Sequence, residues 1–156
     1  MDAEFERLAY ETALRGLDKQ EELLGELRSR TGVLLAAASL AASFLGTDAF
    51  QDPSSVVLVA PLALVAFITS IGASVYILTP KEDLTFSQAG SALYEGLFAY
   101  REDLAEVYRR LAYDLDRFWD SNDARMARLF LAFRIAAVAL VLEILFLAGL
   151  VSGNIF

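Results

Sequence analysis

The sequence predicts an all-α integral membrane protein in which three transmembrane helices and two long amphipathic cytoplasmic helices assemble as a helical homo-oligomer. Three observations favour this fold class. The 156-residue chain is 56% hydrophobic with a mean hydropathy of +0.47, whereas soluble domains are typically about 45–50% apolar. The apolar residues gather in three blocks with little charge. Nearly all Lys and Arg residues lie before the first block or between the second and third, which is the same side of a membrane that the three blocks cross. The length suits a single membrane domain over residues 1–156.

The three apolar blocks are predicted to be transmembrane helices over residues 31–47, 55–79 and 127–151. A helix needs roughly 20 apolar residues to cross about 30 Å of hydrocarbon. The second and third blocks reach that length, and the first is shorter and borrows length from its flanks by snorkelling and local bilayer thinning. A buried helix of a soluble protein is the alternative for each block. Three such blocks in one short chain make that alternative the weaker interpretation.

The positions of Lys and Arg predict the orientation, because cytoplasmic segments carry an excess of these residues. They lie before the first span, between the second and third spans, or at the beginning of the third. We therefore expect a multi-pass protein of the cell membrane, with the N-terminus and residues 80–128 cytoplasmic. The loop 46–55 and the C-terminus are expected outside. Both cytoplasmic segments hold more Asp and Glu than Lys and Arg, which argues against nucleic-acid partners and anionic lipid.

The composition excludes several classes of chemistry. The chain has no Cys and no His, so disulfides, thiol nucleophiles, zinc–thiolate sites and histidine bases are all excluded. No phosphate-binding loop, serine nucleophile motif or metal-ligand cluster occurs in the sequence. The first 30 residues are acidic and amphipathic, unlike a signal peptide. We therefore expect a protein that is not an enzyme and that needs no cofactor and no metal.

Two charged segments, 3–30 and 85–120, are predicted to form the amphipathic helices. Their apolar residues recur at three- and four-residue spacing, the period of one helix face. In the second segment this stripe has a register close to a heptad and comprises Leu93, Leu97, Tyr100, Leu104, Val107, Leu111, Leu115 and Phe118. Thr85 and Gln88 have the spacing of a capping box, and Ser121 and Asn122 are expected to mark a break or cap before the third span. The two helices are natural partners for one another, within one subunit or between neighbours.

The first span is built largely from Ala and Ser, and the second also carries small and hydroxylated residues. Small residues let helix backbones approach closely in lipid, so these spans are predicted to pack against other helices. Ser39 and Ser43 lie one turn apart on the first span, and Thr69 and Ser70 lie on the second. Their hydroxyls either bond to carbonyls of their own helix or line a water-filled path.

The third span contains two ionisable residues, Arg134 and Glu143, each of which costs about 2.5–3.5 kcal/mol at the bilayer centre. Arg134 lies near the cytoplasmic end and is predicted to be a snorkelling anchor. Glu143 lies deeper, about 180° around the helix from Arg134, so the two cannot pair within one helix. Glu143 therefore faces protein or water. It either makes a structural hydrogen bond, as a protonated acid, to one of Ser39, Ser43, Thr69 and Ser70, or it belongs to a ring of acids that selects cations in an oligomeric pore.

The entry to the first span, LRSRTGVLLAAAS at residues 27–39, and the layout of residues 14–119 resemble a known family. The hairpin framed by amphipathic helices is similar to the SLATT domain and to the related Pycsar membrane effectors of prokaryotic defence systems. The resemblance implies self-assembly and membrane disruption or pore formation when a nucleotide signal is made. The third span extends the two-span plan of that family, and no separate sensor domain is recognisable. No catalytic residues are implied.

The leading functional hypothesis is a homo-oligomeric membrane channel or pore-forming effector gated by a cytoplasmic signal. Three spans are too few to enclose a pore, so the hypothesis requires roughly four or more subunits. A non-conducting scaffold or anchor that recruits a cytoplasmic partner is the alternative. Arg109 and Arg110, the only adjacent basic pair, are candidates for binding an anionic ligand such as the nucleotide signal. The other interpretation is that they pair with Glu106 or Asp114 on their own helix.

Overall fold

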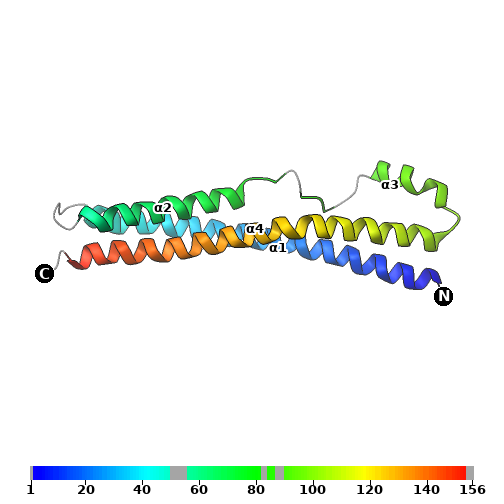
Figure 1. The fold of residues 1–156 in the computed structure, drawn as a ribbon, viewed down its shortest axis with the longest axis horizontal. Coiled ribbons are helices and arrows are strands. Elements are labelled where there is room, and N and C mark those ends of the chain that lie inside the picture. The colour runs from blue at the N-terminus through cyan, green and yellow to red at the C-terminus, as the bar shows by residue number, and fades with distance from the viewer. Residues whose placement is uncertain (1, 50–55, 82–83, 87–89, 154–156) are drawn as a thin grey trace. The chain divides into compact units, whose positions relative to one another are not determined.

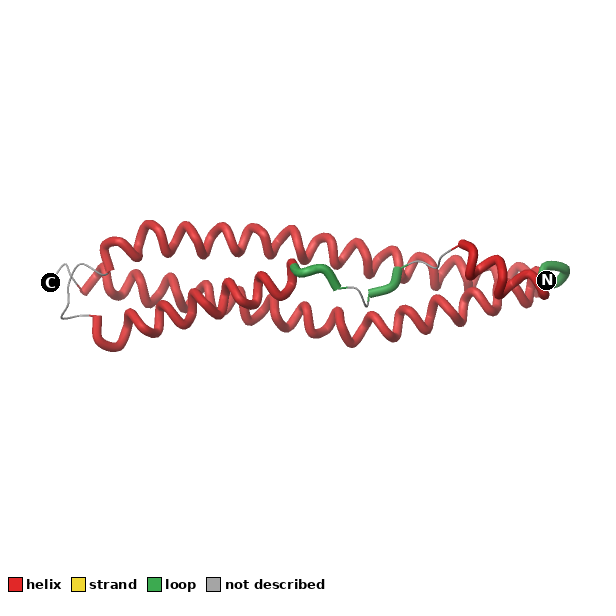
Figure 2. Tube along the Cα trace, turned by 90° about the horizontal axis from the view of Figure 1, so that it is seen from above, coloured by secondary structure: helices red, strands yellow, loops and turns green. Residues whose placement is uncertain are grey.

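The computed structural model describes residues 2–49, 56–81, 84–86 and 90–153 and is helical throughout most of them (Figure 1). Helix α1 spans Asp2–Ala49, α2 spans Val56–Leu78, α3 spans Gly90–Leu97 and α4 spans Leu104–Gly153, with a 3-10 turn at Phe98–Tyr100. Figure 2 shows these helices in red joined by loops in green, and the described residues contain no strand. The predicted all-α class is confirmed.

Two of the described helices are long and apolar enough to cross a membrane, over Val59–Leu78 and within Leu104–Leu150. The first predicted span, 31–47, forms part of α1, and its membrane crossing stays a prediction. Neither α1 nor α4 breaks where its charged segment meets its apolar one. Gly32 is tolerated inside α1 because one helical glycine costs about 1 kcal/mol relative to alanine, much less than losing several backbone hydrogen bonds. The expected break or cap at Asn122 is also not seen.

Helix α2 ends where the sequence predicts. The Thr79 backbone N–H donates to the Val75 carbonyl over 2.9 Å, and the Thr79 hydroxyl donates to the same oxygen over 2.7 Å. Pro80 follows, and a proline disfavours helical geometry at the residue before it. Pro61 lies inside the helix near its N-terminal end, so its missing N–H removes only one backbone bond there.

The single helix expected over 85–120 is instead divided. Helix α3 ends at Leu97, the 3-10 turn follows, and α4 begins only at Leu104. Asp103 explains the division, because its side chain accepts a hydrogen bond from the Glu106 backbone N–H over 3.1 Å. An aspartate at this position satisfies a backbone donor that a helix N-terminus otherwise leaves unpaired. The heptad-like stripe continues through the break and does not reveal it.

The capping box expected at Thr85 and Gln88 stays a prediction. Residues 84–86 are not helical, and Gln88 lies outside the described residues. The Thr85 backbone N–H donates to the side-chain oxygen of Asn122 over 3.2 Å. The Thr85 N–H thus takes part in a tertiary hydrogen bond.

The chain divides into two compact units. Unit 1 comprises Met1–Gly25 and Lys81–Ala127, and unit 2 comprises Glu26–Pro80 and Arg128–Phe156. Unit 1 holds most of the charged residues, and unit 2 holds the three apolar blocks almost entirely. The chain thus separates a charged unit from an apolar one.

Unit 1 is built from the N-terminal part of α1 and the first part of α4, which pack within one chain. Its buried apolar side chains come from the predicted stripes of both helices and include Leu17, Leu24, Leu111 and Leu115. The rings of Tyr10 and Tyr108 meet with centroids 5.7 Å apart. The amphipathic segments are therefore partners within one subunit, which was one of the two arrangements that the sequence left open.

A buried polar network in unit 1 centres on Asn122, which is fully buried. Its amide nitrogen donates to the Thr85 carbonyl over 2.9 Å and to the Gln20 side-chain oxygen over 3.3 Å. Its oxygen accepts the Thr85 N–H, and the Gln20 amide donates to the Trp119 carbonyl over 3.4 Å. One side chain thus joins α1, α4 and the segment 84–86, and a polar residue in mid-helix is accommodated because it is fully hydrogen-bonded.

We expect Asn122→Leu to lower the free energy of unfolding of unit 1 by about 2 kcal/mol, because it leaves buried groups of Gln20 and Thr85 without partners. Emission from the single tryptophan, Trp119, followed against denaturant in detergent, measures the change. Ser121→Leu on the exposed side of the same turn is the control and should change stability by less than about 0.5 kcal/mol. Equal stability of Asn122→Leu and the wild type would contradict the network's role.

Candidate functional site

The predicted site residues of the apolar blocks lie in unit 2, where many large apolar side chains face outward. Exposed ones include Val33, Leu62, Leu64, Val65, Ile68, Val75, Leu131, Ile135, Val138, Val141 and Leu145. Small or polar side chains share the interior with several leucines and Ile77, and they include Thr31, Ala38, Ala60, Ala63, Ala66, Ser70, Ser74, Ala136 and Glu143. Water-soluble proteins more often bury the large apolar residues and expose the polar ones.

Glu143 is fully buried on the inner stripe of α4. Its two carboxyl oxygens have no hydrogen-bond partner among the described residues. This is unusual, because buried polar groups are nearly always hydrogen-bonded. In the described residues no group of three or more Asp or Glu side chains lies close enough to hold a metal ion.

The contacts on either side of Glu143 show what this part of α4 faces. Two turns earlier, the Ala136 carbonyl accepts a hydrogen bond from the Ser70 hydroxyl of α2 over 3.2 Å. One and two turns later, Leu147 and Leu150 pack in one cluster with Ala60 and Ala63 of α2. Glu143 therefore lies between two contacts of α4 with α2.

The predicted polar residues do not gather around Glu143. Ser39 and Thr69 are exposed, and their hydroxyls donate to their own helices, to the Leu35 carbonyl over 2.9 Å and the Val65 carbonyl over 2.7 Å. Ser43 is exposed as well. Ser70 alone is buried, and it bonds to the backbone of α4. Glu143 and Ser70 thus face the interior of unit 2, whereas the other three hydroxyls face outward.

The outward face of α1 carries a stripe of small residues, which we call the small-residue face. It comprises Gly32, Ala36, Ser39 and Ser43, all exposed and separated by four, three and four residues. A Cβ atom added at Gly32 would meet no atom within 4 Å. The absence of a side chain there therefore serves no packing contact within the described part of the subunit.

Arg109 and Arg110 both pair with Glu106 on their own helix. The Arg110 Nε atom lies 2.7 Å from one Glu106 oxygen, and the Arg109 guanidinium contacts the other. The Arg110 guanidinium also stacks over the Tyr100 ring at 3.9 Å from its centroid. Glu106, whose side chain is only 18% exposed, holds both cations. This is the pairing with Glu106 that the sequence offered as one interpretation, and binding of an anionic ligand stays a prediction.

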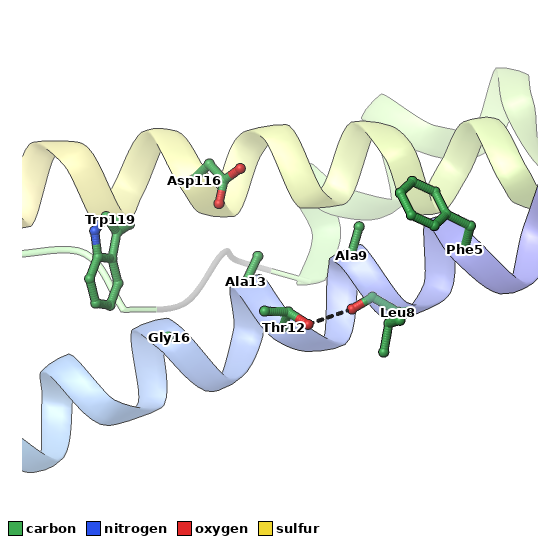
Figure 3. Close-up of a pocket in the computed structure, with 8 residues that line it drawn as sticks. All are labelled: Phe5, Leu8, Ala9, Thr12, Ala13, Gly16, Asp116 and Trp119. Carbon is green, nitrogen blue, oxygen red and sulfur yellow. Dashed lines mark hydrogen bonds between the residues drawn. The ribbon is translucent and has the colours of Figure 1, made fainter.

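A groove of about 500 Å³ opens along α1 and α4 in unit 1 (Figure 3). It is lined by Phe5, Leu8, Ala9, Thr12, Ala13, Gly16, Asp116 and Trp119. The indole of Trp119 lies over Gly16, where an added Cβ would come within 3.2 Å of the ring. The sequence carried a signal for this surface, because Ala9, Ala13 and Gly16 form a stripe of small residues at helical spacing.

Comparisons with known proteins found no match: no family model matches the chain, and no similar curated protein or solved structure was found. The resemblance to the SLATT domain therefore stays a prediction from the residues at 27–39 and the layout of the spans.

We expect Gly16→Leu to displace the indole of Trp119, because even the first side-chain atom would press against the ring. The substitution should lower stability by about 1–3 kcal/mol and shift the emission of Trp119 to longer wavelength. Gly25→Leu is the matched control, since a Cβ at Gly25 meets nothing within 4 Å. That variant should leave the emission unchanged and gain about 0.5–1 kcal/mol from helix propensity. Equal spectra for the two variants would contradict the packing of Trp119 on Gly16.

Proposed function

We propose that this chain is an integral membrane protein of three transmembrane helices that assembles as a homo-oligomeric channel or pore-forming effector. The observation that carries the proposal is the small-residue face of α1, which is exposed and has open space around Gly32. Roughly four or more subunits are needed, because three helices cannot enclose a pore. A cytoplasmic signal opens the assembly, and the resemblance to nucleotide-signalled effectors suggests its chemical class.

The distribution of side chains in unit 2 supports the membrane placement. Lipid cannot hydrogen-bond to protein, so a spanning segment must satisfy its backbone internally, as a helix does. The outward side chains of α2 and α4 are mainly Leu, Val and Ile, whereas Ser70, Ser74 and Glu143 are buried. The 31–47 part of α1 completes the bundle, since Thr31 and Ala38 are fully buried. At 1.5 Å per residue it spans about 25 Å, which moderate thinning of the bilayer accommodates.

The small-residue face supports self-assembly. The exposed side of α1 also carries Val33 and Leu40 beside this face, whereas the four residues of the face itself are small. Small residues at intervals of three and four let two helices approach until their backbones touch. Several copies of α1 can therefore meet around an axis, where Ser39 and Ser43 place hydroxyl groups on the shared face.

Glu143 supports a gating mechanism inside each subunit. Burying a carboxyl group without a hydrogen-bond partner is costly, so meeting water or a donor would remove this cost for Glu143. A rotation of α4 against α2 would bring Glu143 towards a water-filled path. A cytoplasmic signal drives that rotation only by binding the open state more tightly than the closed one. Glu143 then contributes negative charge that favours cations.

The groove in unit 1 favours the second candidate function, a membrane scaffold that recruits a cytoplasmic partner. Two of its residues, Phe5 and Leu8, are 70% and 59% exposed, and large exposed apolar groups often mark contact surfaces. A scaffold would co-purify with a partner and conduct no ions. Ion flux through the purified protein therefore separates the two candidates.

We expect Gly32→Leu to disrupt assembly, because a bulky side chain on the small-residue face separates the helices. The population of the full oligomer, counted by native mass spectrometry in detergent, should fall at least about tenfold. Gly72→Leu on α2 is the matched control, because Gly72 is also exposed and also has no atom within 4 Å of an added Cβ. A wild-type protein that is monomeric, or equal effects of the two variants, would overturn assembly through α1.

We expect liposomes that contain the wild-type protein, with its activating signal or with applied voltage, to pass cations in preference to anions. Glu143→Gln keeps the size of the side chain and removes its charge, so it should lower that preference about tenfold or more. Ser70→Ala, which removes a buried hydroxyl that bonds only to the backbone, should retain the preference. A defined oligomer that passes no ions under any of these conditions would contradict the channel proposal and favour the scaffold function.

A further inference from the structure

A second groove lies on the outward surface of unit 2 between α2 and α4. It has a volume of about 330 Å³ and is lined by Thr69, Arg134, Ile135, Val138, Ala139 and Leu142. Apart from Arg134 and Thr69, these side chains are apolar. The hydroxyl of Thr69 already donates to the Val65 carbonyl, so the guanidinium of Arg134 is the remaining polar donor group in the groove.

Arg134 has no ion-pair or hydrogen-bond partner in the described part of the chain and is exposed. Glu143 cannot serve as its counter-ion, because Glu143 is fully buried and lies about 180° away around α4. A cation at this depth in a membrane is costly unless an anion or water meets it. The structure therefore presents an unpaired cation at one end of an apolar groove.

The order of residues along α4 gives the groove a direction. Arg134 lies six residues, about 9 Å, after Arg128, at the end of the span nearer the charged part of the sequence. Ile135, Val138 and Leu142 continue deeper into the span on one helix face, and they are 46%, 59% and 42% exposed. The polar end thus lies towards the membrane surface, and the apolar part lies towards the membrane centre.

We propose that this groove binds an anionic phospholipid, with its phosphate on Arg134 and an acyl chain along Ile135, Val138 and Leu142. A guanidinium donates two parallel hydrogen bonds to a phosphate, which gives a strong and directional contact. The apolar walls match an acyl chain and exclude a free water-soluble anion as the main ligand. The inference rests on the membrane placement of α2 and α4 and does not depend on ion conduction.

The site is local and does not contradict the acidic balance of the cytoplasmic segments. That balance disfavours a diffuse attraction between the protein and an anionic membrane surface. A single guanidinium inside an apolar groove acts over a few ångströms, where screening by water is weak. A lipid with a net negative charge is preferred because the choline group of phosphatidylcholine offsets its own phosphate.

Native mass spectrometry of the full-length protein with added phosphatidylglycerol or phosphatidylcholine, carrying the same acyl chains, tests the site. The wild type should retain one phosphatidylglycerol per chain about tenfold more tightly than phosphatidylcholine, the effect of one hydrogen-bonded charge pair. Arg134→Gln should remove this preference. Arg128→Gln, which removes an equal charge outside the groove, should keep it. Leu142→Trp, which fills the apolar part, should weaken binding of both lipids.

Equal lipid preferences in wild type and Arg134→Gln, or an equal loss in Arg128→Gln, would overturn the proposal. Competition by soluble glycerol phosphate at the concentration of the lipid would also overturn it, because that result identifies a free-anion site. Circular dichroism of each variant checks that it is folded, and if Arg134→Gln has lost its helices, Leu142→Trp and Arg134→Lys carry the test. The native mass spectra also count subunits, so a loss of lipid with an intact oligomer is distinguished from a loss of assembly.

Discussion

The fold depends on one constraint, that a bilayer supplies no hydrogen-bond partners to the segments inside it. In the proposed placement this constraint makes the apolar blocks helical, turns Leu, Val and Ile outward and hides Ser70, Ser74 and Glu143. Unit 1 follows the opposite rule, with leucines such as Leu17 buried and most charges exposed. Helices α1 and α4 each contribute to both units. Along each of these helices the outward side chains therefore change from mainly charged in unit 1 to mainly uncharged in unit 2.

Two fully buried polar side chains on α4 show how differently the units treat polarity. Asn122 is hydrogen-bonded to Thr85 and Gln20 and holds three segments of unit 1 together. Glu143 has no hydrogen-bond partner among the described residues. A satisfied network rigidifies a structure, whereas an unsatisfied group raises the energy of the state that contains it. Because of this contrast, we infer a structural role for Asn122 and propose that Glu143 takes part in a change of conformation.

Much of the fold was predictable from the sequence, because the apolar blocks and the stripes of Leu17, Leu111 and Leu115 follow helical periods. The break before Leu104 was missed because the apolar stripe continues across it, although Asp103 and Glu106 have the spacing of a helix start. The polar residues of the apolar blocks could be identified from the sequence, but the directions in which their side chains face could not. Helical spacing shows which residues share a face, and only the packing shows that Ser39 faces outward while Glu143 faces inward.

The central claim is that the small-residue face of α1 is the contact between subunits. The chain has no cysteine, so single cysteines can be placed at each position from 31 to 43 and oxidised in native membranes. We expect crosslinked dimers whose yield varies with a helical period and peaks at positions 32, 36, 39 and 43. Peaks at the buried positions 31 and 38, or no crosslinks at any position, would contradict it.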